Sequence, residues 1–121
     1  MALWEIEYTD EFEEWWDMQN AMLQVDIDTV VRLLEKFGTQ LGFPYSSGVE
    51  GSCHSHMREL RIQHKGSPYR ILYAFNPKRT ALLLLGGCKE GKDRWYEQNI
   101  AMADKLYDKH LKELDEEKKN V

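Results

Sequence analysis

A short apolar run in the second half of the chain constrains the fold more than any other feature of the sequence. Five aliphatic residues follow one another from Ala81 to Leu85, and Gly86 and Gly87 come directly after them. A strand that lacks polar alternation is typical of a sheet covered on both faces. The run is also much shorter than the roughly 20 residues that a membrane-spanning helix requires. We therefore expect residues 80–85 to form a central strand, bounded by the two glycines.

The N-terminal part of the chain predicts one strand and two helices. Apolar and acidic residues alternate over residues 3–8, which is the period of a half-exposed strand. Thr9 or Asp10 is placed to cap a helix whose first turn is acidic, as the helix dipole favours. Apolar residues at helical spacing from Ile27 to Phe37 predict a second helix that ends at Gly38. The two helices are expected to form an acidic hairpin.

The C-terminal part predicts a β-hairpin, the central strand and a final helix. Residues 39–55 are rich in Gly, Pro and Ser and are expected to form a loop. Strands over residues 57–64 and 69–75 flank a turn. After the central strand, Asp93 is placed to cap a helix whose apolar residues keep helical spacing from Tyr96 to Leu111.

These elements predict an α+β domain in the order β-α-α-β-β-β-α, with an N-terminal helical hairpin and a C-terminal helix. Runs of strands that follow runs of helices indicate a mainly antiparallel sheet, here of four strands. A chain of 121 residues has a common size for one domain, so we expect a single domain over residues 1–121. The polar end, residues 115–121, is expected to fray.

The net charge of −5 is distributed very unevenly along the chain. Residues 1–53 hold eleven carboxylates and two basic side chains, a net charge of −9. Residues 54–94 hold nine basic and three acidic side chains, a net charge of +6, and residues 95–121 carry −2. A basic segment between acidic flanks can form a local positive surface that attracts phosphate, although scattered solubilising charge is an equally good reading of the numbers.

Several kinds of site are not supported by the sequence. Neither GxxxxGK[ST] nor GxGxxG is present, so no nucleotide cofactor is expected. Cys53, His54 and His56 are potential metal ligands, but they lack the paired spacing of zinc sites, so no metal is expected. No GxSxG motif supports a nucleophilic serine.

The sequence also predicts a cytoplasmic protein. The N-terminus has neither the basic nor the apolar region of a signal peptide. Cys53 and Cys88 are too few for a disulfide scaffold, and we expect both thiols to be reduced.

The residues best suited to chemistry are cations and one phenol in the second half of the chain. They are Arg58, Arg61, Arg70, Lys89, Lys92, Arg94 and Tyr96. Guanidinium and ammonium groups are the side chains that bind phosphate. Strand parity leaves Arg70 part-buried beside Leu72, where its charge needs a partner. The same pattern is typical of cross-strand pairing with carboxylates such as Glu59 and of a solvated loop, so the residues alone leave both interpretations open.

Four stretches of sequence carry a resemblance to a known family. They are MRELR at 57–61, YRILYAFNP at 69–77, LLLGG at 83–87 and RWY at 94–96. These stretches resemble the phage-derived, HigB-like branch of the RelE/ParE toxin superfamily. The resemblance extends from Trp4 to about Leu114, and it implies a RelE-like fold.

The resemblance also implies roles for individual residues. Arg70 corresponds to the strand arginine that binds the scissile phosphate in RelE-like enzymes, Arg61 to a cation on the preceding strand, and Tyr96 to a tyrosine on the final helix. Further RNA contacts are expected from Arg58, Lys89, Lys92, Arg94 and His54. The sequence departs from the family in its acidic net charge and in Glu59, where some relatives have lysine.

The implied function is that of the toxin in a type II toxin–antitoxin system, an endoribonuclease that cleaves mRNA on the ribosome. The RNA 2′-hydroxyl attacks its own phosphate without a metal, and Tyr96 is the candidate general base, although a free phenol has a pKa of about 10. If Tyr96 only packs in the core, the alternative bases are His54, His56 and Glu59. The expected partners are mRNA and a cognate antitoxin, a helix-turn-helix protein encoded next door; no membrane is expected. The alternative is a ParE-like gyrase inhibitor or an inactive homologue that retains antitoxin binding.

Overall fold

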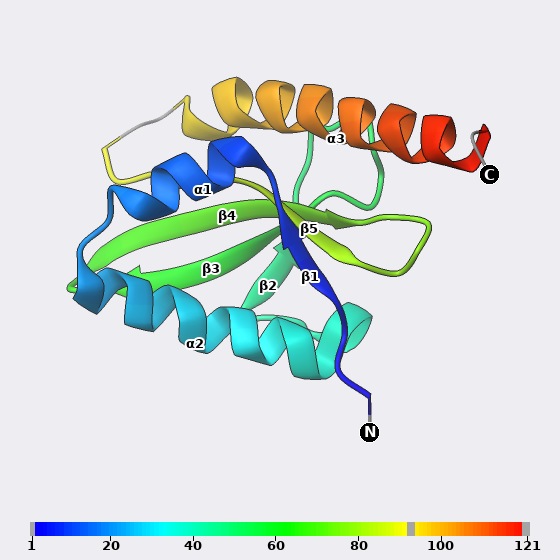
Figure 1. Cartoon of the computed structure of the whole chain (residues 1–121). Coiled ribbons are helices and arrows are strands. Elements are labelled where there is room, and N and C mark those ends of the chain that lie inside the picture. The colour runs from blue at the N-terminus through cyan, green and yellow to red at the C-terminus, as the bar shows by residue number, and fades with distance from the viewer. Residues whose placement is uncertain (1, 92–93, 120–121) are drawn as a thin grey trace.

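In the computed structural model, which describes residues 2–91 and 94–119, a five-stranded mixed sheet forms the middle layer (Figure 1). The strands are β1 (Ile6–Tyr8), β2 (Ser46–Gly48), β3 (Arg58–His64), β4 (Ser67–Phe75) and β5 (Ala81–Cys88). The helices are α1 (Asp10–Asp17), α2 (Ala21–Phe37) and α3 (Trp95–Lys119), with a short 3-10 turn at Gly38–Gln40. The strand order is β1-β5-β4-β3-β2.

The pairing confirms the predicted α+β class with a mainly antiparallel sheet. Strand β1 runs parallel to β5, and the other three pairs of neighbouring strands are antiparallel. The predicted number of four strands was wrong, because β2 forms inside the segment 39–55 that was expected to be a loop. Its residues are Ser, Ser and Gly, which carry no strand signal; the strand exists because Ser46 pairs with Leu60 and is fully buried.

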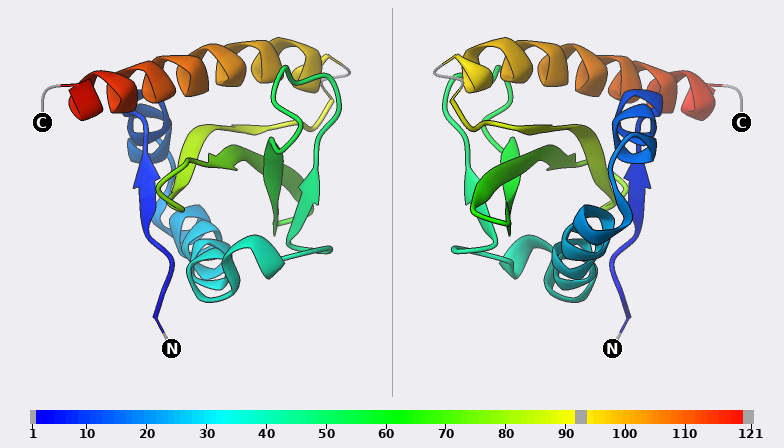
Figure 2. Two further views of the ribbon diagram at one scale, coloured as in Figure 1. Left: turned by 90° about the vertical axis from the view of Figure 1, so that its right-hand side faces the viewer. Right: turned by 90° about the vertical axis from the view of Figure 1, so that its left-hand side faces the viewer.

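Helices cover both faces of the sheet (Figures 1 and 2). One core lies between the sheet and helices α1 and α2, and it includes Leu83 of β5. The other core lies between the sheet and α3, and it includes Leu82 and Leu84 of the same strand. The expectation that residues 80–85 are covered on both faces is therefore confirmed. The strand is interior, although the middle position of the sheet belongs to β4.

The helix ends follow the capping chemistry of the sequence. The side chain of Thr9, and not that of Asp10, caps α1 by accepting a hydrogen bond of 3.0 Å from the Phe12 amide. Helix α2 ends at Gly38, as predicted. The backbone of Gly38 has a φ of +55°, and a Cβ there would lie 2.1 Å from the Trp4 ring. This glycine therefore lets the N-terminal segment pack against the end of α2.

The prediction that Gly86 and Gly87 bound the strand was wrong, because β5 continues to Cys88. A Cβ at Gly86 would lie 2.4 Å from the Trp15 ring, and one at Gly87 would lie 2.7 Å from the Trp95 ring. The two glycines let tryptophans of different helices pack directly on the strand backbone. Their role is close packing and not strand termination.

The last helix begins at Trp95 and is regular to Lys119, so it includes most of the segment that was expected to fray. The predicted cap Asp93 lies outside the described residues. None of the helices in the described ranges combines the length and the apolar character that crossing a membrane requires.

Candidate functional site

Four side chains from three elements meet on the face of the sheet that α3 covers. Glu59 and Arg61 are two residues apart on β3 and therefore point to the same face. Arg70 of β4 is the direct cross-strand partner of Arg61. Tyr96 lies in the first turn of α3. We call Glu59, Arg61, Arg70 and Tyr96 the Glu59 cluster.

The carboxylate of Glu59 is the centre of this cluster. Only 5% of the residue is exposed. Its Oε1 atom accepts a hydrogen bond of 2.6 Å from the Tyr96 hydroxyl, and its Oε2 atom accepts one of 3.0 Å from Ser47 Oγ on β2. The Nη1 atom of Arg61 lies 3.4 Å from Oε2, and the Nε atom of Arg70 lies 3.2 Å from Oε1. Both oxygens of the buried carboxylate are thus held from several directions.

Arg70 is buried but incompletely hydrogen-bonded. The residue is 4% exposed, and its Nη1 atom donates to the backbone oxygen of Tyr69 at 2.9 Å. Its Nε atom is within ion-pair distance of Glu59, yet the N–H direction misses the carboxylate, and Nε has no hydrogen-bond partner among the described residues. The expectation of a part-buried Arg70 that needs a partner is confirmed, since Glu59 supplies the opposite charge. The buried Nε donor is left without an acceptor.

The surroundings of Tyr96 keep its phenol protonated. Burial raises the pKa of Tyr96 above its ordinary value, and the hydrogen bond to Glu59 raises it further, while Arg70 partly offsets the effect. The phenol is therefore a hydrogen-bond donor at neutral pH. It orients the Glu59 carboxylate.

The Glu59 cluster has more positive than negative charge on the side that faces solvent. The Arg61 side chain is 28% exposed, so its guanidinium reaches solvent while Arg70 does not. The Nζ atom of Lys89, directly after β5, lies 5.3 Å from the centre of the Tyr96 ring. Two arginines beside the Glu59 carboxylate and a lysine beside the Tyr96 ring thus leave the region positive and suited to an anion.

Arg58 and Arg94, which were also predicted to bind RNA, lie outside the Glu59 cluster. Arg58 points to the other face of the sheet, where its Nε atom donates to Ser46 Oγ at 3.1 Å. Arg94 is exposed and pairs with Glu97 at 3.7 Å. Lys92 lies outside the described residues.

His54 belongs to a loop that is fastened to α3 farther along the helix. Its Nε2 atom lies 2.7 Å from Asp108 Oδ1. The same loop is held by Asp104, which accepts hydrogen bonds from Ser52 Oγ and from the Cys53 amide. Asp108 follows Tyr96 by twelve residues, which is about 18 Å of helix. His54 is therefore outside the Glu59 cluster.

Two site residues were not among the predicted ones. Glu59 was noted as a departure from the family, as a pairing partner of arginines and, with His54 and His56, as an alternative base to Tyr96, and Ser47 was assigned to a loop. The sequence signal for Glu59 was its position two residues before Arg61 on a predicted strand, which places both side chains on the same face of the sheet. Nothing local indicated Ser47, because its strand exists only through pairing with β3. In the described part of the chain, no three or more His, Cys, Asp or Glu side chains are grouped to hold a metal ion.

Comparison with known proteins relates the chain to toxin candidates. The family model described as phage derived protein Gp49-like matches residues 14–108. The toxin candidate HigB3 of Mycobacterium tuberculosis is 42% identical over 93 residues, which cover 76% of this chain and 80% of HigB3. The toxin candidate HigB2 of the same organism is 40% identical over 90 residues, but the match spans only 45% of HigB2 and 73% of this chain.

Solved structures show the same fold at much lower sequence identity. The isolated E. coli RelE toxin superposes with a TM-score of 0.54 at 13% identity, and the match covers 79% of this chain and 95% of that one. The predicted RelE-like fold is therefore confirmed. The chain belongs to the phage derived Gp49-like family and is related to the HigB-type toxin candidates.

Proposed function

We propose that this protein is the toxin of a type II toxin–antitoxin pair and that it cleaves mRNA on the ribosome at the Glu59 cluster. The observation that carries this proposal is the meeting of Arg61, Arg70 and Tyr96 around one buried carboxylate. Donors that stabilise added negative charge on phosphate and a group that accepts a proton are what metal-free phosphate transesterification requires. The relation to toxin candidates supports the same function.

The arginines are assigned to the phosphate. Arg61 reaches solvent and is placed to donate hydrogen bonds to the phosphate, and the buried positive charge of Arg70 behind it adds to the positive potential at that position. During the attack the phosphorus gains a fifth oxygen ligand and additional negative charge. Preorganised donors at such a position typically contribute about 10²- to 10³-fold each to the rate.

Glu59 is assigned as the general base. The proton of the attacking 2′-hydroxyl passes to the carboxylate, the bond from O2′ to phosphorus forms, and the bond from phosphorus to O5′ breaks. The departing O5′ takes up a proton from water, and the hydroxide that is left removes the proton from the Glu59 carboxyl group. A cyclic phosphate remains on the RNA. Tyr96 serves as the positioning residue of this base, because its raised pKa opposes loss of the phenol proton.

The proposed partner is an antitoxin, a protein encoded beside this one. An enzyme that cleaves cellular message arrests the growth of its host, so its activity must be blocked until it is needed. An antitoxin that binds the folded toxin supplies this control. The protein is proposed to act in the cytoplasm, where message and ribosomes are found.

The proposal is tested by induced expression in a bacterial host, with growth and the 5′ ends of ribosome-bound transcripts as readouts. Wild type is expected to arrest growth and to produce new 5′ ends. Glu59→Gln is expected to reduce cleavage by about 10²- to 10⁴-fold. Glu59→Asp keeps the charge and is expected to remain folded with part of the activity. Glu97→Gln is the matched control, because Glu97 is exposed on α3 beside Tyr96.

Two outcomes contradict the proposal. Growth arrest without new transcript ends points to a target such as gyrase. Folded Glu59→Gln protein that cleaves like wild type removes Glu59 from the chemistry, and a chemical denaturation curve of each variant establishes that it is folded.

A further inference from the structure

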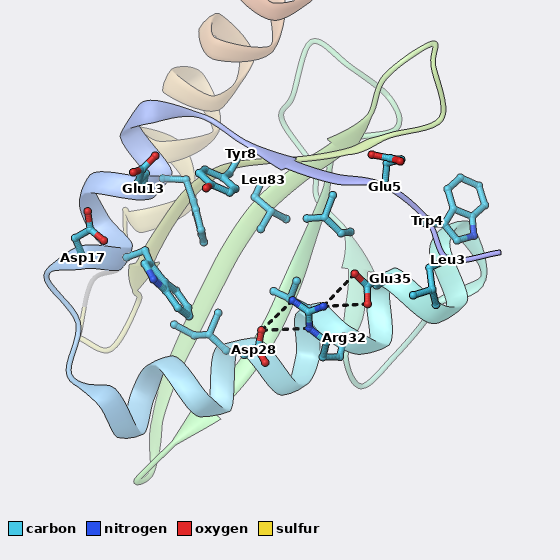
Figure 3. A pocket seen from close by; sticks show the side chains of 15 residues that line it. Leu3, Trp4, Glu5, Tyr8, Glu13, Asp17, Asp28, Arg32, Glu35 and Leu83 are labelled. Carbon is cyan, nitrogen blue, oxygen red and sulfur yellow. Dashed lines mark hydrogen bonds and ion pairs between the residues drawn. The ribbon is translucent and has the colours of Figure 1, made fainter. Parts of the chain in front are cut away.

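A groove lies on the other side of the sheet from the Glu59 cluster. It has a volume of about 640 Å³ and is lined by residues of β1, α1 and α2 and of the segment before β1 (Figure 3). The Glu59 cluster lies on the face that α3 covers, whereas the groove is lined by residues of α1 and α2. Helices α3 and α2 lie on opposite sides of the sheet (Figure 2). A molecule that occupies the groove therefore need not touch the proposed catalytic residues.

The floor of the groove is apolar and its walls expose large apolar side chains. Phe12, Ile27 and Val31 line it and belong to the core between the helices and the sheet. Leu3 and Tyr8 stand at the groove with 62% and 57% of their surface exposed. Apolar side chains that gather around a hollow indicate an interaction surface more strongly than single exposed residues do.

The rim of the groove is acidic. Arg32 is already paired with Asp28 and Glu35, at 3.2 Å and 3.0 Å. Glu5 of the segment before β1 and Glu13 and Asp17 of α1 also line the groove, and within the described ranges no cation lies within 4.0 Å of their carboxylates. Figure 3 shows Glu13 and Asp17 side by side along one wall. Uncompensated carboxylates around an apolar floor select a ligand that is both apolar and positively charged.

The strand beside the groove is also an unpaired edge. Strand β1 is the last strand of the sheet and pairs only with β5. An edge strand presents free backbone donors and acceptors to an incoming peptide segment. The groove therefore offers an apolar floor, negative charge and backbone hydrogen bonds to the same ligand.

We propose that this groove is the docking site for a basic, amphipathic segment of the antitoxin. The inference rests on the proposed function for the existence of that partner. RNA is disfavoured in the groove because the rim repels phosphate. A second copy of this chain is disfavoured because residues 1–53, which supply most of the groove, carry a net charge of −9. The antitoxin segment is thus held at a place remote from the Glu59 cluster.

Two double variants of the same helix test this inference. Glu13→Lys/Asp17→Lys reverses the charge along the groove wall, whereas Glu11→Lys/Glu14→Lys makes the same charge change at exposed positions of α1 that do not line the groove. The partner is the protein encoded by the adjacent small gene. Affinity is measured with purified proteins, growth arrest and rescue are measured in cells, and thermal melts establish folding.

The groove variant is expected to bind the antitoxin at least about 100-fold more weakly, because like charges across an interface cost several kcal/mol. It is still expected to arrest growth, now without rescue by the antitoxin, while the control variant is rescued. Leu3→Ser, which removes exposed apolar surface without a charge change, is expected to weaken binding to a smaller extent.

The outcomes separate the two proposals. If wild type binds the adjacent protein and both double variants bind it equally, the groove inference is wrong and the proposed function stands. If wild type arrests growth but binds no adjacent protein, the antitoxin and the groove inference fail together. If the wild-type protein forms a dimer in the absence of a partner, and only the groove variant disrupts this dimer, the occupant of the groove is a second copy of this chain. That result contradicts the inference.

Discussion

Arg61 of β3 and Arg70 of β4 lie directly opposite each other in the antiparallel register, and both lie within ion-pair distance of the single carboxylate of Glu59. Two like charges at paired positions destabilise a sheet. The carboxylate between them offsets that repulsion. The same contact keeps two guanidinium groups together without a bound phosphate.

The first prediction concerns the stability of this buried ion pair. Arg70→Ala is expected to lower the free energy of unfolding by about 3–5 kcal/mol, because it leaves the Glu59 carboxylate buried without its closest buried cation. The double variant Glu59→Met/Arg70→Met removes both charges. Its loss in the free energy of unfolding is expected to be smaller than the sum of the losses of the two single Met variants. Urea denaturation of wild type, the two single Met variants and the double variant measures the coupling. Additive losses show that the two side chains do not interact.

The second prediction separates the roles of Tyr96 and Glu59. Tyr96→Phe deletes the hydrogen bond to Glu59 and is expected to lower the free energy of unfolding by about 1–2 kcal/mol. Because Tyr96 is assigned as a positioning residue, Tyr96→Phe is expected to reduce cleavage by less than about 10²-fold. A loss of about 10²-fold or more is typical of a missing general base. Quantified cleavage of ribosome-bound message measures this, with Tyr8→Phe as the control. A loss for Tyr96→Phe as large as that for Glu59→Gln assigns the base to the phenol.

The third prediction concerns close packing on β5. Gly86→Ala places a methyl group 2.4 Å from the Trp15 ring, so the ring or the strand must move. The expected loss in the free energy of unfolding is about 1–3 kcal/mol. Gly42→Ala is the control, because a Cβ there has no heavy atom within 4 Å beyond its chain neighbours. Equal stability of the two variants contradicts the packing role.

The fourth prediction concerns alkaline pH. Burial raises the pKa of both Tyr96 and Tyr107 in the folded protein. A group whose pKa is higher folded than unfolded stabilises the fold fully below its unfolded pKa, here about 10, and loses that contribution as the pH rises through the folded value. Stability is therefore expected to fall above about pH 10. Absorbance of tyrosinate against pH measures the late ionisation, and Tyr96→Phe is expected to remove part of it. Simultaneous ionisation of all tyrosines near pH 10 contradicts the prediction.

Local signals in the sequence determined most of the secondary structure. Thr9 and Gly38 mark helix ends because capping depends on a few neighbouring residues. The apolar run that begins at Ala81 required cover on both faces, and the structure has helices on both. The stretches around Arg70 also carried the family resemblance, which the comparisons confirmed.

Only the tertiary structure decided which residues meet. Tyr96 and Glu59 are 37 residues apart, and their contact depends on where α3 crosses the sheet. Strand parity separates Arg58 from Glu59 by face, but it does not say which face α3 covers. Ser47 enters the site through a strand that has no local signal of its own. The physical reason is that side-chain periodicity reports whether a position is buried, whereas the partner of that position depends on register and layer packing, which are set by contacts distant in the sequence.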